Sequence, residues 1–334
     1  MKRILVTGAT GNIGREVVAQ LRTTNNRVRA MTRSPESANL PEGVDVVRGD
    51  LTSDVLDDCL AGVDAVFLVW TAPIAAAAAA VQRIASHAER IVLLSSPHRT
   101  EHPFFQQPNA LRAIHAAIDQ MVEASGLQWT VLRPSVFALN CLHWWAPQTR
   151  NGNVVRWFHG DAATAPIHER DIAAVAVRAL CDEGYHGRDY VLTGPESLTQ
   201  REQVRIIGDA IGKPLFFAEL SPESARREIF SMMPPWIADM LLGAYGAAVD
   251  RPVLDVNGRG SHRRAGASFR TMGRGPRDCV PGAILTLSKR SGLEGGWRGR
   301  MWRFPVDDLR RELKLQLRLP QTTRDSARFG SRSD

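Results

Sequence analysis

The chain has 334 residues, of which 44% are hydrophobic and 23% are charged, a composition that is ordinary for one large or two small globular domains. No apolar run approaches the ~18 residues that a membrane span needs, and the apolar stretch at the N-terminus is too short for a signal peptide. Four cysteines stand far apart without paired spacing. This disfavours a disulfide scaffold or a zinc knuckle, and favours a reducing, cytoplasmic location.

The net charge of +7 is distributed unevenly along the chain. Residues 1–250 carry 23 Lys+Arg and 27 Asp+Glu, whereas residues 251–334 carry 19 and 8. An argument from charge for a nucleic-acid partner therefore concerns only the last quarter, where few aromatic residues are interleaved with the arginines. We expect a small-molecule substrate, no nucleic-acid or membrane partner, and a monomer or homodimer.

Strand and helix patterns alternate along the first 140 residues. In chain order they predict a strand at 4–6, a helix at 16–21, strands at 28–31, 44–47 and 65–69, a helix beginning at Pro73, a strand at 91–94, a helix at 111–124 and a strand at 129–132. The strand runs are continuously apolar, as in strands that helices cover on both faces. The sequence thus predicts an α/β fold with a doubly wound, mostly parallel sheet.

The later residues are less regular. Helices are predicted at 171–180, with Asp171 as its N-cap, and at 199–211, and a strand at 189–192. We interpret residues 1–140 as a dinucleotide-binding domain and residues 141–253 as a small substrate lobe with segments that return to the first domain. Residues 254–334 form an irregular Arg/Gly-rich basic tail.

Two interpretations of this tail stay open. The first is a disordered basic segment. The second is translation out of an ancestral reading frame. If suitable synonymous codons are chosen for residues 255–280 and translated one base later, the resulting amino-acid sequence has the apolar period of a helix. In that shifted frame the codons of Met272-Gly273 necessarily encode a tryptophan. In the second case the tail has no evolved function.

The most informative motif is Thr7-Gly8-Ala9-Thr10-Gly11-Asn12-Ile13-Gly14, which follows the first strand and opens a helix. Gly8 permits a tight turn, Gly11 lets a pyrophosphate approach the backbone, and Gly14 lets the helix pack on the strand. The helix N-terminus offers free N–H groups to phosphate. Thr7, Thr10, Asn12 and Ile13 complete the predicted cofactor loop.

The end of the second strand decides which dinucleotide is favoured. It carries no acid for a ribose 2′-hydroxyl, and Arg33 stands where a 2′-phosphate would lie, which favours NADP(H) over NAD(H). A solvated surface arginine is the alternative. Asp50 and Leu51 are predicted to bound the adenine, although Asp50 also suits a helix cap. Val69 and Trp70 are predicted to line the adenosine.

Together with several later segments, these residues resemble the NmrA-like branch of the atypical short-chain dehydrogenases/reductases. The resemblance rests on the glycine loop, Arg33, and residues 49–51, 125–134, 165–173 and 192–196. It covers roughly residues 2–253, and implies a Rossmann domain that binds NADP(H) or NAD(H) with a small C-terminal lobe. Family members include reductases of small carbonyl or quinone substrates and catalytically silent redox sensors.

The usual Tyr-x-x-x-Lys pair of these reductases is missing, since none of the three tyrosines is followed four residues later by lysine. The spacing puts His115 at the lysine position, and Asp119, four residues on, could orient it. Ser95 and Ser96 end the fifth strand and could hydrogen-bond a substrate oxygen. The alternatives are a local helix pair for His115 and strand-end capping for the serines.

Three aromatic residues are candidates for the substrate site, namely Phe137, Trp144 and Trp145. The two tryptophans could form an apolar lid over a flat substrate, with core or subunit-interface packing as the alternative. No metal is expected, because the side chains of His168 and Glu169 point in different directions. The favoured hypothesis is an NAD(P)H-dependent reductase of a small apolar carbonyl or quinone. The alternative is a non-catalytic NADP(H)-binding redox sensor.

Overall fold

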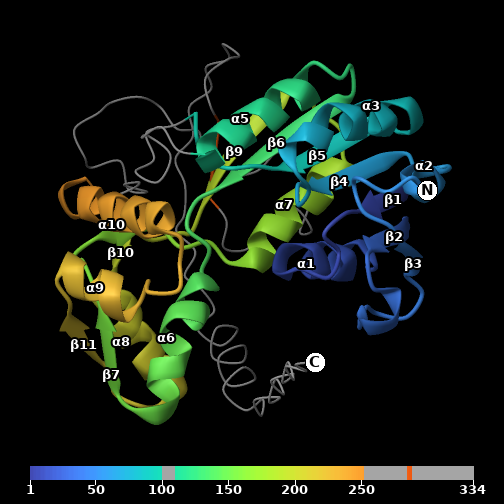
Figure 1. The fold of residues 1–334 in the computed structure, drawn as a ribbon. Helices are drawn as coiled ribbons and strands as arrows, with labels where there is room; N and C mark the ends of the chain where they lie inside the picture. Colours follow the sequence, from blue (N-terminus) through green and yellow to red (C-terminus); the bar gives the residue numbers. More distant parts are fainter. Residues whose placement is uncertain (100–109, 252–283, 288–334) are drawn as a thin grey trace, which may run out of the picture.

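The computed structural model describes residues 1–99, 110–251 and 284–287 (Figure 1). Its main feature is an eight-stranded sheet in the order β12-β9-β6-β5-β4-β1-β2-β3. The strands are β1 (Arg3–Val6), β2 (Arg27–Thr32), β3 (Asp45–Arg48), β4 (Ala65–Val69), β5 (Arg90–Leu94), β6 (Gln128–Pro134), β9 (Arg188–Thr193) and β12 (Ile284–Leu287). Seven of them run parallel, and β12 pairs antiparallel with β9.

Helices cover both faces of this sheet, which explains its continuously apolar strands. Along β4, Ala65 and Phe67 face one core, while Val66 and Leu68 face the other. The first core lies under α1 (Asn12–Leu21) and α7 (Glu169–Cys181). The second lies under α2 (Leu56–Leu60), α3 (Ala77–His87) and α5 (Ala110–Glu123). The predicted doubly wound Rossmann sheet is therefore confirmed.

The structure corrects two details of the predicted domain. A short helix, α2, lies between β3 and β4, where the sequence offered only a possible helix cap at Asp50, and the observed N-cap is Val55. Pro73 precedes a 3-10 turn (Ile74–Ala76), and α3 begins only at Ala77, so the proline does not occupy the first turn of that helix. The alanine run has no polar cap to mark where the α-helix begins.

A smaller lobe lies beside the carboxyl edge of the sheet (Figure 1). It contains α6 (Asn140–Asn151), β7 (Val154–Trp157), β8 (Ala163–Thr164), β10 (Leu198–Thr199), α8 (Gln200–Ile211), β11 (Phe216–Glu219), α9 (Pro222–Glu228) and α10 (Pro235–Asp250). Its core forms around Trp157, which stacks on Phe158 with ring centroids 4.9 Å apart. The sequence pattern indicated only α8 among these elements, with Ser197 or Thr199 as its cap, and the structure has Thr199 as the N-cap.

Within the described part of the chain, even the longest helix falls short of the length and apolarity that crossing a membrane requires. The two interpretations of residues 254–334 concern a segment that lies outside the described residues, apart from β12.

Candidate dinucleotide and substrate site

The loop between β1 and α1 is a tight turn tied to the neighbouring strand β4. Gly8 has a φ of +59°, a left-handed conformation that glycine adopts at little cost. The Gly11 N–H donates to the Gly8 carbonyl at 2.9 Å. Thr7 accepts a hydrogen bond from the Val69 N–H at 2.8 Å, which links the end of β1 to the end of β4.

Helix α1 begins so close to this turn that only glycine fits at its third position. A Cβ on Gly14 would lie 2.1 Å from the Gly8 carbonyl oxygen. Gly11 is the N-cap and supplies no side-chain cap, and Thr10, Gly11 and Asn12 are exposed. The first N–H groups of α1 are therefore open to an anion, and the cradle fits a pyrophosphate. Ile13 is buried in the core beneath it.

Arg15, which sequence reasoning missed, braces this loop from outside. Its Nε donates to the Thr10 carbonyl at 2.9 Å, and its Nη1 donates to the Asn39 carbonyl at 2.8 Å. The only sequence signal for this role was an arginine in the first turn of the helix. Its two partners lie in separate segments of the chain, so the sequence alone did not reveal them.

The predicted ribose and adenine end lies at the carboxyl ends of β2 and β3. Arg33 is exposed, and within the described residues its guanidinium has no hydrogen bond or ion pair. Asp50 accepts hydrogen bonds from the Thr52 hydroxyl and N–H, and these bonds hold the pKa of its carboxyl below the usual value. Leu51 is only 4% exposed and packs in the core beneath the carboxyl ends of β2 and β3.

Val69 and Trp70 follow the end of β4 next to the glycine turn. A Cβ on Gly8 would lie 3.1 Å from the Cβ of Val69, so this side chain sets the floor of the turn. The indole Nε1 of Trp70 is buried and finds no hydrogen-bond acceptor among the described residues. A buried donor of this kind costs free energy.

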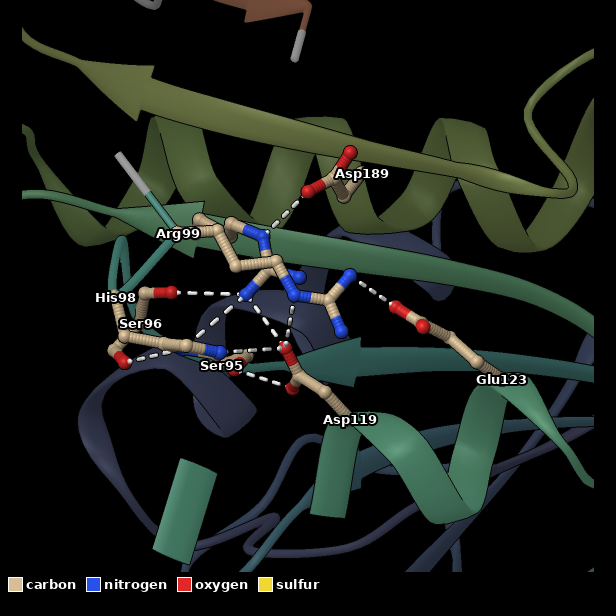
Figure 2. A network of polar contacts seen from close by, with 8 residues as sticks. Ser95, Ser96, His98, Arg99, Asp119, Glu123 and Asp189 are labelled. Carbon is tan, nitrogen blue, oxygen red and sulfur yellow. Dashed lines mark hydrogen bonds and ion pairs between the residues drawn. The ribbon is translucent and has the colours of Figure 1, made fainter. Parts of the chain in front are cut away.

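A buried polar network occupies the carboxyl ends of β5 and β6 (Figure 2). Arg133 and Asp119 are both 0% exposed, and their charged groups approach to 2.6 Å. Arg133 also pairs with Asp189 at 2.7 Å, and Ser95 donates its hydroxyl proton to Asp119 at 2.6 Å. The Ser95 proton is thus directed into the protein rather than towards a substrate.

His98 belongs to the same network as a neutral imidazole. Its Nδ1 lies 3.4 Å from Arg133 Nη1 and 3.3 Å from the Ser96 hydroxyl. A guanidinium can only donate, so Nδ1 accepts and the ring proton lies on Nε2, which is 3.4 Å from Asp119. Burial outweighs the attraction of Asp119 and lowers the pKa of His98 to about 4.

This burial predicts a loss of stability in mild acid. The unfolded chain binds a proton on His98 with an ordinary pKa near ~6.5, so acidification favours unfolding until the pH falls through the folded value. For His98 alone, we expect the free energy of unfolding to fall by about 2 kcal/mol between pH 7 and pH 5. Urea titrations of wild type and His98→Gln would measure this, and an equal fall in both proteins would contradict it.

His115 lies on α5 and is half-buried beside the network. Burial is the main cause of its lowered pKa, with Asp119 acting in the opposite direction. Asp119 is held by Ser95, His98 and Arg133, so it does not serve His115 alone. Neighbouring residues 100–109 lie outside the described part of the chain.

The lobe residues proposed for a substrate lid are placed differently from one another. Trp145 is only 3% exposed and packs edge-on against Trp157, so it belongs to the lobe core. Trp144 stacks on Trp157 at 5.3 Å and is half-buried. Phe137 is half-buried against the sheet core. Both tryptophans of α6 contact Trp157, but the lobe core encloses only Trp145.

The N-terminus of α7 also differs from expectation. His168 is the N-cap, and its Nδ1 accepts a hydrogen bond from the Arg170 N–H at 3.0 Å. The predicted cap, Asp171, lies inside the first turn, because the helix begins earlier, at Glu169.

The glycine cradle at the β1–α1 turn of a doubly wound parallel sheet defines the chain as a dinucleotide-binding protein of the Rossmann class. A family model described as NAD(P)H-binding matches residues 8–183. The chain therefore belongs to this NAD(P)H-binding family, of the NmrA-like, atypical short-chain dehydrogenase type.

Named relatives and a solved structure agree with this assignment. The chain is 39% identical over 248 residues to the (4-alkanoyl-5-oxo-2,5-dihydrofuran-3-yl)methyl phosphate reductase of Streptomyces griseus, covering 72% of this chain and 84% of the relative. It is 30% identical to the NAD(P)H azoreductase of Xenophilus azovorans, with 73% and 87% coverage. An NADPH-dependent quinone oxidoreductase of Escherichia coli superposes with a TM-score of 0.61 at 25% identity, with 76% and 91% coverage.

Proposed function

We propose that this protein reduces a small, flat, apolar acceptor, a quinone or a carbonyl compound conjugated to a double bond, with NADPH as the favoured cofactor. The observation that carries this proposal is the combination of a pyrophosphate cradle with the half-buried imidazole of His115, which lies beside a polar network that has no tyrosine among its described residues. All three tyrosines, Tyr185, Tyr190 and Tyr245, are buried in cores.

The missing Tyr-x-x-x-Lys pair agrees with an acceptor of this kind. Bound NADPH supplies the hydride. An isolated ketone would then carry a localised, strongly basic alkoxide that needs a matched acid in the transition state. A conjugated acceptor spreads the charge over several atoms, so hydrogen-bond donors suffice and water can deliver the proton. The furanone, azo and quinone relatives are named for acceptors with such conjugated systems.

Within this proposal, His115 faces the acceptor as a neutral hydrogen-bond donor. Its lowered pKa keeps the imidazole uncharged near neutral pH, where a ring N–H can stabilise charge that develops on the substrate oxygen. Ser95 and Ser96 act through the network that fixes the end of β5, since their hydroxyl groups bond Asp119 and His98. Phe137 and Trp144 supply the apolar wall of the substrate site.

The test joins a binding measurement to a turnover measurement. We expect wild type to bind NADPH more tightly than NADH in a fluorescence titration, and to oxidise it with quinones or unsaturated lactones. His115→Ala should lower kcat by about 10- to 100-fold through loss of the donor, with the NADPH Kd unchanged. His143→Ala, an exposed histidine on α6, is the matched control. Full activity in His115→Ala would remove this residue from the proposal.

A non-catalytic NADP(H) sensor is the second candidate. It is favoured by the closed network of Ser95, Asp119 and His98, which directs the Ser95 hydroxyl proton inward. Tight NADPH binding by wild type without turnover of any quinone, azo compound or unsaturated lactone would support the sensor. Failure to bind either dinucleotide would refute both candidates.

A further inference from the structure

Two arginines come together at the corner of the sheet where β2 and β3 end. Arg33 follows β2, and Arg48 is the last residue of β3, where the strand register pairs it with Thr32. The Arg48 Nη1 donates to the Arg33 carbonyl at 2.7 Å. Both side chains are exposed, and both start from the edge that carries the glycine turn.

The two arginines differ in their partners. Arg33 has no hydrogen bond or ion pair through its guanidinium within the described residues. Arg48 forms an ion pair through its Nη2 with Glu36, which lies on the 3-10 turn after β2. The side chains of this pair are 61% and 73% exposed, and an exposed ion pair in water contributes little. Arg48 can therefore exchange its partner at small cost.

Glu36 is ionised at neutral pH. A backbone hydrogen bond is the largest cause of its lowered pKa, and Arg48 lowers the pKa further. A carboxylate in this corner repels a phosphate, yet it can accept a hydrogen bond from a hydroxyl group. The corner thus offers a guanidinium and a carboxylate to the 2′ substituent of a bound ribose.

We infer that Arg48 is a second ligand for the 2′-phosphate of NADPH and that the phosphate replaces Glu36 as its partner. With NADH the Glu36–Arg48 pair stays closed, and Glu36 remains as an acceptor for the 2′-hydroxyl. A guanidinium binds phosphate through two parallel hydrogen bonds, which are stronger than its exposed pairing with a carboxylate. This inference rests on the proposed preference for NADP(H), and it assigns the preference to three residues instead of Arg33 alone.

The experiment measures binding without any acceptor. Dissociation constants for NADPH and NADH are taken from fluorescence titrations of the full chain, with 2′,5′-ADP and 5′-AMP as competing fragments. We expect Arg48→Gln to raise the Kd for NADPH and 2′,5′-ADP about tenfold, and to leave those for NADH and 5′-AMP within about twofold. Glu36→Gln should lower the NADPH Kd severalfold. Arg27→Gln, at the opposite end of β2, is the matched control and should change neither.

Equal weakening of NADPH and NADH in Arg48→Gln would overturn the inference, because it would show that Arg48 only supports the turn that carries Arg33. An unchanged NADPH Kd in Glu36→Gln would overturn the exchange. Turnover is a separate readout: a protein that shows the expected binding pattern without turnover contradicts the proposed reductase and leaves this inference standing. Equal binding of both dinucleotides by wild type overturns this inference and the cofactor preference, while the reductase itself remains.

Discussion

Replacing Gly14 by alanine is expected to lower kcat/KM for NADPH by about 100-fold, because a shift of the cradle by about 1 Å misplaces the cofactor. The added Cβ would lie 2.1 Å from the Gly8 carbonyl oxygen and 3.0 Å from the Ala9 Cα. All of these close atoms belong to the backbone, so the clash cannot be relieved by a rotamer change. Helix α1 must move away from β1, and its N-terminal N–H groups move with it.

A matched control separates this clash from the general effect of adding a methyl group. Gly243 lies on α10 and a Cβ there meets no atom within 4 Å. Gly243→Ala should stabilise the fold by up to about 1 kcal/mol through helix propensity, with no effect on NADPH binding. Circular dichroism melts and NADPH titrations of both variants test this. A Gly14→Ala protein that binds NADPH as wild type does would show that the cradle tolerates displacement.

Replacing Asp119 by alanine should destabilise the fold by about 3–5 kcal/mol, the range for removing one partner of a buried ion pair. Arg133 would keep its full charge at 0% exposure with only Asp189, at the edge of the network, to balance it. Ser95 and His98 would also lose an acceptor (Figure 2). Urea unfolding at pH 7 measures the change.

Two further variants distinguish an unpaired charge from a simple cavity. The double variant Asp119→Leu with Arg133→Met removes both charges and should recover most of the stability, because apolar groups of similar volume can replace a buried pair. Asp209→Ala breaks the exposed Arg205–Asp209 pair on α8 and should change stability by less than about 0.5 kcal/mol. A mild effect of Asp119→Ala alone would mean that Arg133 finds another partner or water.

The contacts of this buried network could not be predicted from the sequence. Ser95 and Ser96 were placed correctly at the carboxyl edge of β5, yet their hydroxyl partners come from α5 and from the loop after β5. The partners of Asp119 are Ser95, 24 residues before it, His98, 21 residues before it in the loop after β5, and Arg133, 14 residues after it on β6. No local pattern encodes such contacts, because they depend on how α5 packs on the sheet.

The sequence by itself determined the parallel sheet and its phosphate cradle. Continuous apolar runs specify strands that are buried on both faces, and the strand–Gly8–Gly11–Gly14–helix order leaves one local conformation for the turn. These signals are local in the chain, so they can be interpreted without the fold. The 16–21, 111–124 and 199–211 helix patterns succeeded for the same reason.

Only the tertiary structure decided which polar and aromatic side chains remain open to a ligand. Trp145 and Trp144 have the same residue type and adjacent positions, but the lobe core takes Trp145 almost completely and leaves Trp144 half-buried. Arg48 has no motif of its own, and reaches the Arg33 corner because β2 and β3 pair in parallel register. Burial and long-range pairing are properties of the packed chain, since they depend on segments far apart in the sequence.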